Sequence, residues 1–197
     1  MAKLEKYGEE KINPIEKLAR IIKGKKVVIY GASWSGKTTL AIHLIPHLGA
    51  TLYLDSDGNY PVEEMAQKLN AKILYKRVDN FVQAIKAMEN ANMDAVIIDS
   101  MSGLIASLYE KEGVGSPRVT LLSAQYQERL IKLSEKFNTA IIITHVGADF
   151  RRQSERIRIN QALLRYIDVI VKLDIVNGKR KIIVQKREPV EKPDFEF

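Results

Sequence analysis

The sequence contains no cysteine, and this absence excludes disulfide bonds and thiolate metal sites. No apolar run approaches the roughly 18 residues that a membrane-spanning helix requires. The first residues, MAKLEKYGEEKINP, mix acids with lysines and lack the apolar stretch of a secretory signal peptide. Together these absences favour a cytoplasmic protein without a membrane partner.

The composition is that of a globular domain. The chain has 197 residues, of which 46% are hydrophobic and 28% charged, and this length suits one domain with one sizeable core. It shows no internal repeat, low-complexity tract or linker. We therefore expect a single domain over residues 1–197, with residues 1–25 forming a short N-terminal helical segment.

Basic residues outnumber acidic ones, and the excess is concentrated late in the chain. The net charge is +7, and residues 172–187 hold six basic residues against one acid, Asp174. Just upstream, the segment from Arg151 to Arg158 carries four arginines. Such a distribution favours anionic partners, nucleic acid among them.

Short apolar strands alternate with helices along the chain, which predicts an α/β fold with a mostly parallel sheet buried on both faces. The last strands, separated by Asn177 and Gly178, predict a C-terminal antiparallel hairpin. We expect strands at 25–31, 50–56, 71–76, 94–100 and 138–145, and helical segments at 13–22, 36–48, 61–69, 78–91, 103–109, 119–137 and 161–167.

A complete P-loop pattern, GASWSGKT, lies between the first predicted strand and the next helix. Its backbone N–H groups and the helix N-terminus would cradle the phosphates of ATP. Lys37 is expected to reach the β- and γ-phosphates, and Thr38 to ligate Mg²⁺. The predicted nucleotide-binding residues are Gly31, Ala32, Ser33, Trp34, Ser35, Gly36, Lys37, Thr38 and Thr39.

A second acidic motif follows the P-loop by about sixty residues. In DAVIIDS, Asp99 ends an apolar strand, where a Walker B carboxylate holds Mg²⁺ or its water. The same residue could instead cap the following helix. The P-loop upstream favours the metal role.

The order of these motifs resembles the RecA/RadA superfamily core, from about Ile12 to Phe197. It combines the P-loop, the acidic strand end LYLDSDGN, the Walker B strand, a long helix, NTAIIITHV, an arginine-bearing loop and a basic hairpin. The similarity is greatest to reduced members, namely archaeal RadA paralogs of the RadB type and phage RecA-like annealing ATPases. We expect no separate N-terminal DNA-binding domain of the kind that strand-exchange enzymes carry, so the resemblance implies a paralog or accessory ATPase.

The resemblance also assigns catalytic and sensor positions. Asp57 matches a glutamate that orients the attacking water, and with Lys37 it would form the catalytic pair. Because its side chain is one methylene shorter, hydrolysis could be slow or DNA-stimulated; Asp55 and Asp57 could also be simple turn residues before Gly58. Thr144 and His145 match a pair that senses the γ-phosphate, although a histidine at a strand end is often only a hydrogen-bonded polar residue.

DNA contacts are implied for two loops by their position. Residues 110–118 and 146–160 match the family's DNA-binding loops, and guanidinium groups suit phosphates while an aromatic ring can stack on a base. A solvated loop without a ligand is the alternative. The implied contacts to single-stranded DNA are Arg118, Phe150, Arg151, Arg152, Arg156 and Arg158, and Lys186 and Arg187 would contact a neighbouring subunit's phosphate.

The resemblance thus implies an ATP- and Mg²⁺-dependent protein that binds single-stranded DNA and assists recombination or repair, with a recombinase or further copies of itself as partners. Two other classes fit parts of the sequence. A small P-loop kinase would use the arginines at 151–158 as a lid over the phosphates. A KaiC-like regulatory ATPase would act on protein partners.

Overall fold

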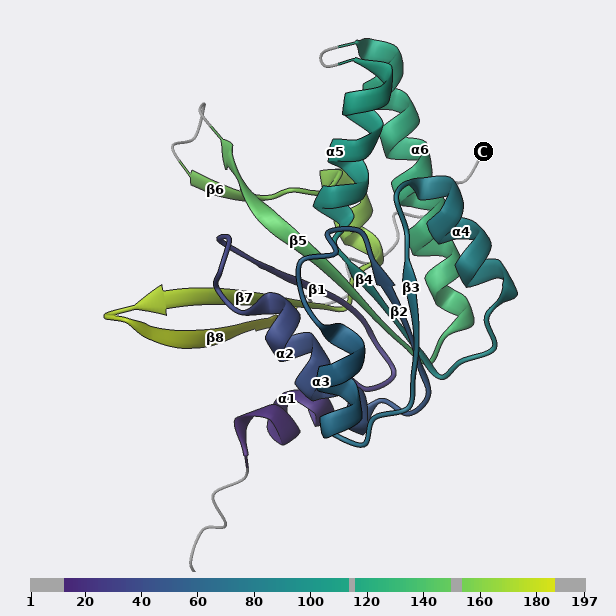
Figure 1. Ribbon diagram of the computed structural model, residues 1–197. Helices are drawn as coiled ribbons and strands as arrows, with labels where there is room; N and C mark the ends of the chain where they lie inside the picture. Colours follow the sequence, from purple (N-terminus) through teal and green to yellow (C-terminus); the bar gives the residue numbers. More distant parts are fainter. Residues whose placement is uncertain (1–12, 114–115, 150–153, 187–197) are drawn as a thin grey trace, which may run out of the picture.

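Strands and helices alternate in the computed structural model of the chain, which describes residues 13–113, 116–149 and 154–186 (Figure 1). The strands are β1 (Lys26–Gly31), β2 (Thr51–Asp55), β3 (Ile73–Arg77), β4 (Ala95–Asp99), β5 (Thr139–Asp149), β6 (Ser154–Ile157), β7 (Val169–Val176) and β8 (Lys179–Lys186). The α-helices are α1 (Pro14–Ile22), α2 (Lys37–Leu44), α3 (Val62–Lys68), α4 (Phe81–Asn90), α5 (Met101–Glu112) and α6 (Pro117–Leu133), and shorter 3₁₀ turns lie at Ile45–His47, Ser134–Lys136 and Gln161–Tyr166.

The strands form one mixed sheet in the order β3-β2-β4-β5-β1-β7-β8, with β6 paired to β5 beyond the main sheet. All neighbours from β3 to β7 run parallel, and β7 and β8 form the antiparallel hairpin. The expected α/β fold with a C-terminal hairpin is therefore confirmed. Asn177 and Gly178 adopt φ values of 52° and 73° in the hairpin turn, a conformation that Asn and Gly tolerate best.

Helices cover both faces of the sheet: α1, α2 and α3 lie on one side, and α4, α5 and α6 on the other (Figure 1). Successive side chains of β4 alternate between the two layers. Val96 and Ile98 pack with the layer of α4 and α6, whereas Ala95 and Ile97 pack with the layer of α1 and α2. This two-sided burial explains why the central strands are apolar throughout. Among the described residues, no helix is long and apolar enough to cross a membrane.

The first predicted DNA-binding loop is much shorter than expected. Helix α5 continues to Glu112 and α6 begins at Pro117, so most of residues 110–118 is helical. Pro117 suits the first turn of a helix because its missing N–H would have no partner there. The Gly/Pro composition predicts a loop over residues 110–118, whereas in the structure α5 extends to Glu112 and α6 already begins at Pro117. Arg118 lies in the first turn of α6 and is exposed.

The second predicted loop is also wrong in part, because its described residues form a β-hairpin. Strand β5 continues to Asp149, and Val146 to Asp149 pair antiparallel with Ile157 to Ser154 of β6. This two-stranded extension lies beyond the central sheet (Figure 1). This extension is not enclosed between two helix layers as the central strands are. Its sequence therefore lacks the continuous apolar pattern by which the core strands could be recognised.

Candidate nucleotide-binding site

The P-loop connects the end of β1 at Gly31 to the start of α2 at Lys37. Gly36 has φ 96°, a conformation that side chains other than glycine rarely adopt. At Gly31, a Cβ atom would overlap the carbonyl oxygen of Leu173 in β7. Both glycines of the motif are therefore required, one by its backbone conformation and the other by a close strand neighbour.

Lys37 is buried, and its ammonium group bonds to backbone carbonyls within the P-loop. Its Nζ donates to the carbonyl oxygens of Ala32 at 2.7 Å and Gly31 at 3.2 Å. Burial lowers the pKa of Lys37, although Asp99 and Asp57 oppose this shift. Among the described residues it forms no ion pair, so its charge is available to a ligand in the loop.

Asp99, at the end of β4, is hydrogen-bonded to residues of α2 and β2. Its Oδ2 accepts hydrogen bonds from the Thr38 hydroxyl at 2.7 Å and from the Tyr53 hydroxyl at 2.6 Å. Burial raises the pKa of Asp99 to about 6, while these two hydrogen bonds act in the opposite direction. The cap of α5 is Ser100, whose Oγ accepts from the Gly103 N–H at 3.0 Å, so Asp99 does not serve as the cap.

The two aspartates after β2 have different surroundings. Asp55 is buried and accepts hydrogen bonds from the N–H groups of Asp57 and Gly58, and from the Tyr75 hydroxyl. It therefore organises the turn. Among the described residues, the donors to the Asp57 carboxylate are the Ser56 and Ser100 hydroxyls, at 3.1 and 3.2 Å. Its carboxylate is held in place by neutral donors and borders the cavity described next.

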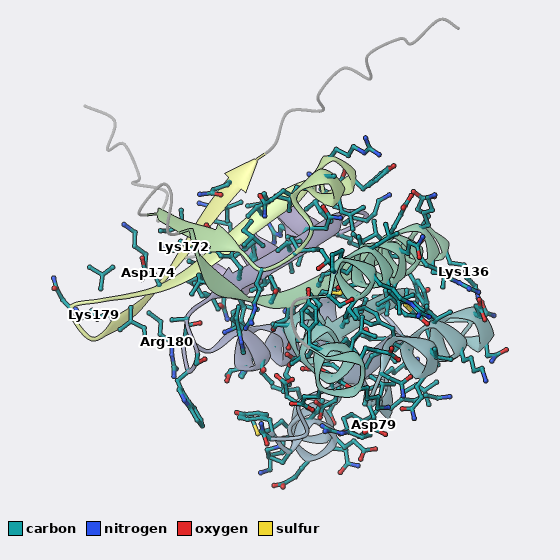
Figure 2. All side chains as sticks on the ribbon, turned by 90° about the horizontal axis from the view of Figure 1, so that it is seen from above. Asp79, Lys136, Lys172, Asp174, Lys179 and Arg180 are labelled. Atoms are coloured by element: carbon teal, nitrogen blue, oxygen red, sulfur yellow. The ribbon has the colours of Figure 1, made fainter. Side chains whose placement is uncertain are left out.

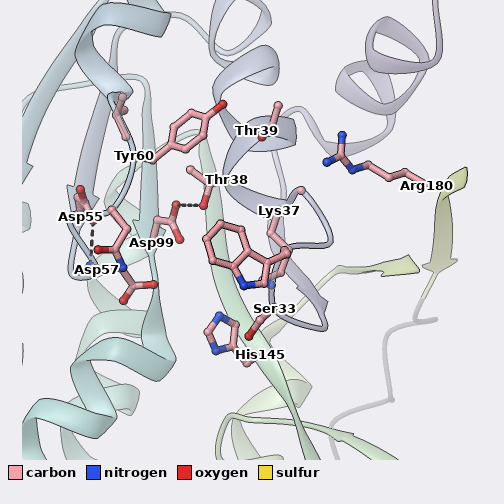
Figure 3. A pocket seen from close by; sticks show the side chains of 14 residues that line it. Ser33, Lys37, Thr38, Thr39, Asp55, Asp57, Tyr60, Asp99, His145 and Arg180 are labelled. Atoms are coloured by element: carbon pink, nitrogen blue, oxygen red, sulfur yellow. Dashed lines mark hydrogen bonds between the residues drawn. The ribbon is translucent and has the colours of Figure 1, made fainter. Parts of the chain in front are cut away.

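These groups surround one open cavity of about 510 Å³ (Figure 3). The P-loop forms its floor, and the carboxylates of β2 and β4 lie along one side. Carboxylate and hydroxyl oxygens are the ligands that Mg²⁺ prefers, so Thr38 and Asp99 fit a magnesium ion. The lining residues are Ser33, Trp34, Gly36, Lys37, Thr38, Thr39, Asp55, Asp57, Asn59, Tyr60, Val62, Asp99, His145 and Arg180.

Of the predicted sensor pair, His145 faces the cavity and Thr144 bonds to the residue that follows the β5–β6 hairpin. His145 is half-buried, lines the cavity and pairs in register with Gly31 of the P-loop. Burial lowers its pKa, and Lys37 lowers it further, so the imidazole is neutral at pH 7. Thr144 is fully buried and donates instead to the carbonyl oxygen of Arg158 at 2.9 Å. The Arg158 N–H in turn donates to the His145 carbonyl oxygen.

The remaining predicted residues lie away from this cavity or outside the described residues. Arg158 is exposed at the end of the β5–β6 hairpin. Lys186 pairs with Val169 at the start of β7, whereas the P-loop lies beside Leu173, so Lys186 is at the opposite end of the strand. For Arg156 and Lys186 only the backbone is described, and Phe150, Arg151, Arg152 and Arg187 fall outside the described residues.

Several site residues were not foreseen. In the sequence, Tyr53 is indistinguishable from the other apolar residues of its strand, yet its hydroxyl donates a hydrogen bond to Asp99. Tyr60 and Asn59 follow the acidic strand end, and Arg180 comes from the C-terminal hairpin. Alternation in β2 could have placed Tyr53 and Asp55 on the same face of the strand. The position of Arg180 depends on the pairing of β7 with β1, which no local pattern specifies.

A P-loop between β1 and α2, an acid at the end of β4 and a strand between them define a RecA-like nucleotide-binding fold. No protein-family model matches the chain. RecA proteins are similar in sequence: that of Oceanobacillus iheyensis is 29% identical over 138 residues, covering 63% of this chain and 40% of the relative. That of Campylobacter jejuni subsp. doylei is 29% identical over 191 residues, covering 86% and 54%.

A solved structure of the RadB recombinase shares the fold. It aligns with a TM-score of 0.63 and 20% identity, covering 85% of this chain and 83% of that chain. The chain therefore has a RecA-like fold. It spans less than two thirds of the length of these RecA relatives.

Trp34 provides a direct test of ligand entry. Its side chain is 91% exposed and lies at the cavity, so a bound nucleotide would change the surroundings of the indole. Titration with MgATP should therefore change the tryptophan emission, with Trp34→Phe as the variant that removes the signal. An unchanged emission at saturation, with binding shown by calorimetry, would mean that the indole does not sense the site.

Asp99→Asn should stabilise the nucleotide-free protein at neutral pH. Because the folded-state pKa of Asp99 is raised, ionisation destabilises the folded state, and this cost grows as pH rises from about 4 to about 6. The amide keeps an oxygen that can accept from Tyr53 and Thr38. Urea unfolding with EDTA should show a gain of about 1–3 kcal/mol at pH 8 and little at pH 4. An equal gain at both pH values would contradict this assignment.

Proposed function

We propose that this protein is an ATPase that binds ATP with Mg²⁺ in the P-loop cavity. One observation carries the proposal: Lys37, Thr38 and Asp99 converge on a single open cavity although they come from two distant segments of the chain. The Lys37 ammonium group donates to backbone carbonyl oxygens, so it can rebind to phosphate oxygens without breaking an ion pair. Similarity to RecA proteins supports the same function.

Each residue has a distinct task in this proposal. The P-loop N–H groups and Lys37 bind the phosphate chain, and the Tyr53 hydroxyl keeps Asp99 directed at Thr38. Magnesium, when bound, would neutralise charge on the β- and γ-phosphates through the oxygens of Thr38 and Asp99. The neutral ring of His145 can donate one hydrogen bond into the cavity without adding charge.

Asp57 is proposed to orient the water that attacks the γ-phosphate. Its position at the cavity, fixed by the Ser56 and Ser100 hydroxyls, supports this role. The aspartate side chain is shorter than glutamate, and the two serine contacts restrict how far its carboxylate can extend. We therefore expect slow hydrolysis unless DNA or another subunit rearranges the site.

We further propose that the β5–β6 hairpin binds single-stranded DNA and that the protein assists recombination or repair, together with a recombinase or with its own copies. Two hydrogen bonds support coupling between the hairpin and the cavity. Thr144 and His145 both contact the backbone of Arg158, and His145 also lines the cavity. A change at the phosphates could thus shift the hairpin, and the sequence between its two strands holds Arg151 and Arg152.

The ATPase proposal is tested by phosphate release with and without single-stranded DNA. We expect slow basal turnover, stimulation by DNA, and loss of turnover by at least about tenfold in Lys37→Ala. Lys23→Ala, which replaces an exposed lysine at the C-cap of α1 outside the cavity lining, serves as the control. DNA-independent transfer of the γ-phosphate to a small molecule would instead support the kinase alternative.

The DNA proposal is tested with Arg151→Ala/Arg152→Ala. If the four arginines at positions 151, 152, 156 and 158 each contact a phosphate, raising the salt from about 50 to about 200 mM should weaken binding of single-stranded DNA about 50-fold. The double variant should bind single-stranded DNA more weakly, with a shallower salt dependence, and keep its ATP affinity. Arg20→Ala/Arg129→Ala removes the same charge from α1 and α6 as a control. DNA binding like that of the wild type would show that the hairpin is not the contact surface.

A further inference from the structure

The β7–β8 hairpin brings one arginine to the nucleotide cavity of the same chain. Arg180 lies on β8, two residues after Gly178 of the turn, and pairs with Ile175 of β7. Its side chain extends from the hairpin to the edge of the P-loop, on the side away from Asp57 and Asp99 (Figure 3). A Cβ atom on Gly36 would lie 3.1 Å from the Arg180 Nε. The guanidinium group therefore lies directly over the P-loop backbone.

No described residue accounts for this position of Arg180. Its guanidinium group has no hydrogen bond or ion pair among the described residues. The acid of the same hairpin, Asp174, pairs with Lys172 at 3.2 Å (Figure 2). Arginine donors are rarely left without acceptors at the mouth of a polar cavity, because five N–H groups then depend on water alone. This suggests that its partner is a ligand.

The charges around the cavity identify the kind of ligand. Among the described lining residues, Asp55, Asp57 and Asp99 bring three carboxylates, and the permanent cations are Lys37 and Arg180. Lys37 lies deep in the loop, whereas Arg180 lies at its outer edge. A phosphate chain seated on the P-loop would pass between them. The forked guanidinium group matches phosphate oxygens better than any other side chain.

We propose that Arg180 binds the phosphate chain of the nucleotide in the same subunit and thereby fixes the β7–β8 hairpin over the occupied site. This inference rests on the proposed ATP binding and adds a residue outside the P-loop motif. It differs from the expected contact of Lys186 and Arg187 with a neighbouring subunit. The hairpin also exposes Ile175, Val176 and Lys179, so nucleotide would determine how this basic and apolar surface is presented.

The test is calorimetric titration of Arg180→Ala and Arg180→Lys with MgATP and with magnesium tripolyphosphate, which has neither base nor ribose. Loss of a charged hydrogen-bonding partner should weaken both ligands about 10- to 100-fold in the alanine variant, with partial recovery in the lysine variant. Lys179→Ala, which removes the same charge one residue earlier outside the cavity lining, should stay within about twofold of the wild type. Thermal unfolding confirms that each variant is folded.

Hydrogen exchange provides a second readout that does not depend on affinity. At saturating MgATP, amides of residues 175–185 should exchange more slowly than in the free protein, and this protection should be lost in Arg180→Ala. Unchanged affinity and unchanged hairpin protection in that variant would overturn the inference. So would a loss confined to ATP with tripolyphosphate unaffected, because it would place Arg180 on the base or ribose. If the wild type itself bound neither ligand, the proposed function would fail instead.

Discussion

The hydrogen bond from Thr38 to Asp99 is the interaction on which the arrangement of the site depends. Thr38 follows β1, whereas Asp99 ends β4, and β5 lies between these two strands in the sheet. The bond therefore joins two parts of the sheet across an intervening strand. It requires that the carboxyl ends of β1 and β4 lie at the same edge of the sheet, which the parallel pairing of both strands with β5 provides. The buried core residues of β4 and β5 thus determine where a magnesium ion could bind.

Burial sets the electrostatics of this site. Asp99, Tyr53 and Lys37 are all enclosed, and desolvation is the largest cause of the raised pKa of Asp99 and the lowered pKa of Lys37. Both groups are therefore less stable in their charged forms than they would be in water. A bound magnesium nucleotide would supply opposite charge to each of them. The free energy of this compensation would favour binding and would offset part of the cost of burying them.

Local patterns predicted the fold and the centre of the site because each rests on short-range chemistry. The P-loop motif, the apolar strands and the Asn177–Gly178 turn specify their own structures, and Lys37 and Asp99 line one cavity. Tyr53 and Arg180 were missed because their roles arise from strand pairing between distant segments. The sequence predicts a loop at residues 146–160 because the paired segments Val146–Asp149 and Ser154–Ile157 lack the apolar pattern of a core strand.

Strand β5 connects the P-loop cavity to the β5–β6 hairpin. It contributes His145 to the nucleotide cavity and continues without a break into the β5–β6 hairpin. Every coupling proposed between nucleotide and DNA requires that the cavity binds MgATP. Equilibrium titration with ATP, with and without Mg²⁺, tests that requirement most directly. The account predicts saturable binding of one nucleotide per chain, weakened at least about tenfold when Mg²⁺ is removed. Absence of binding, or equal affinity without Mg²⁺, would contradict it.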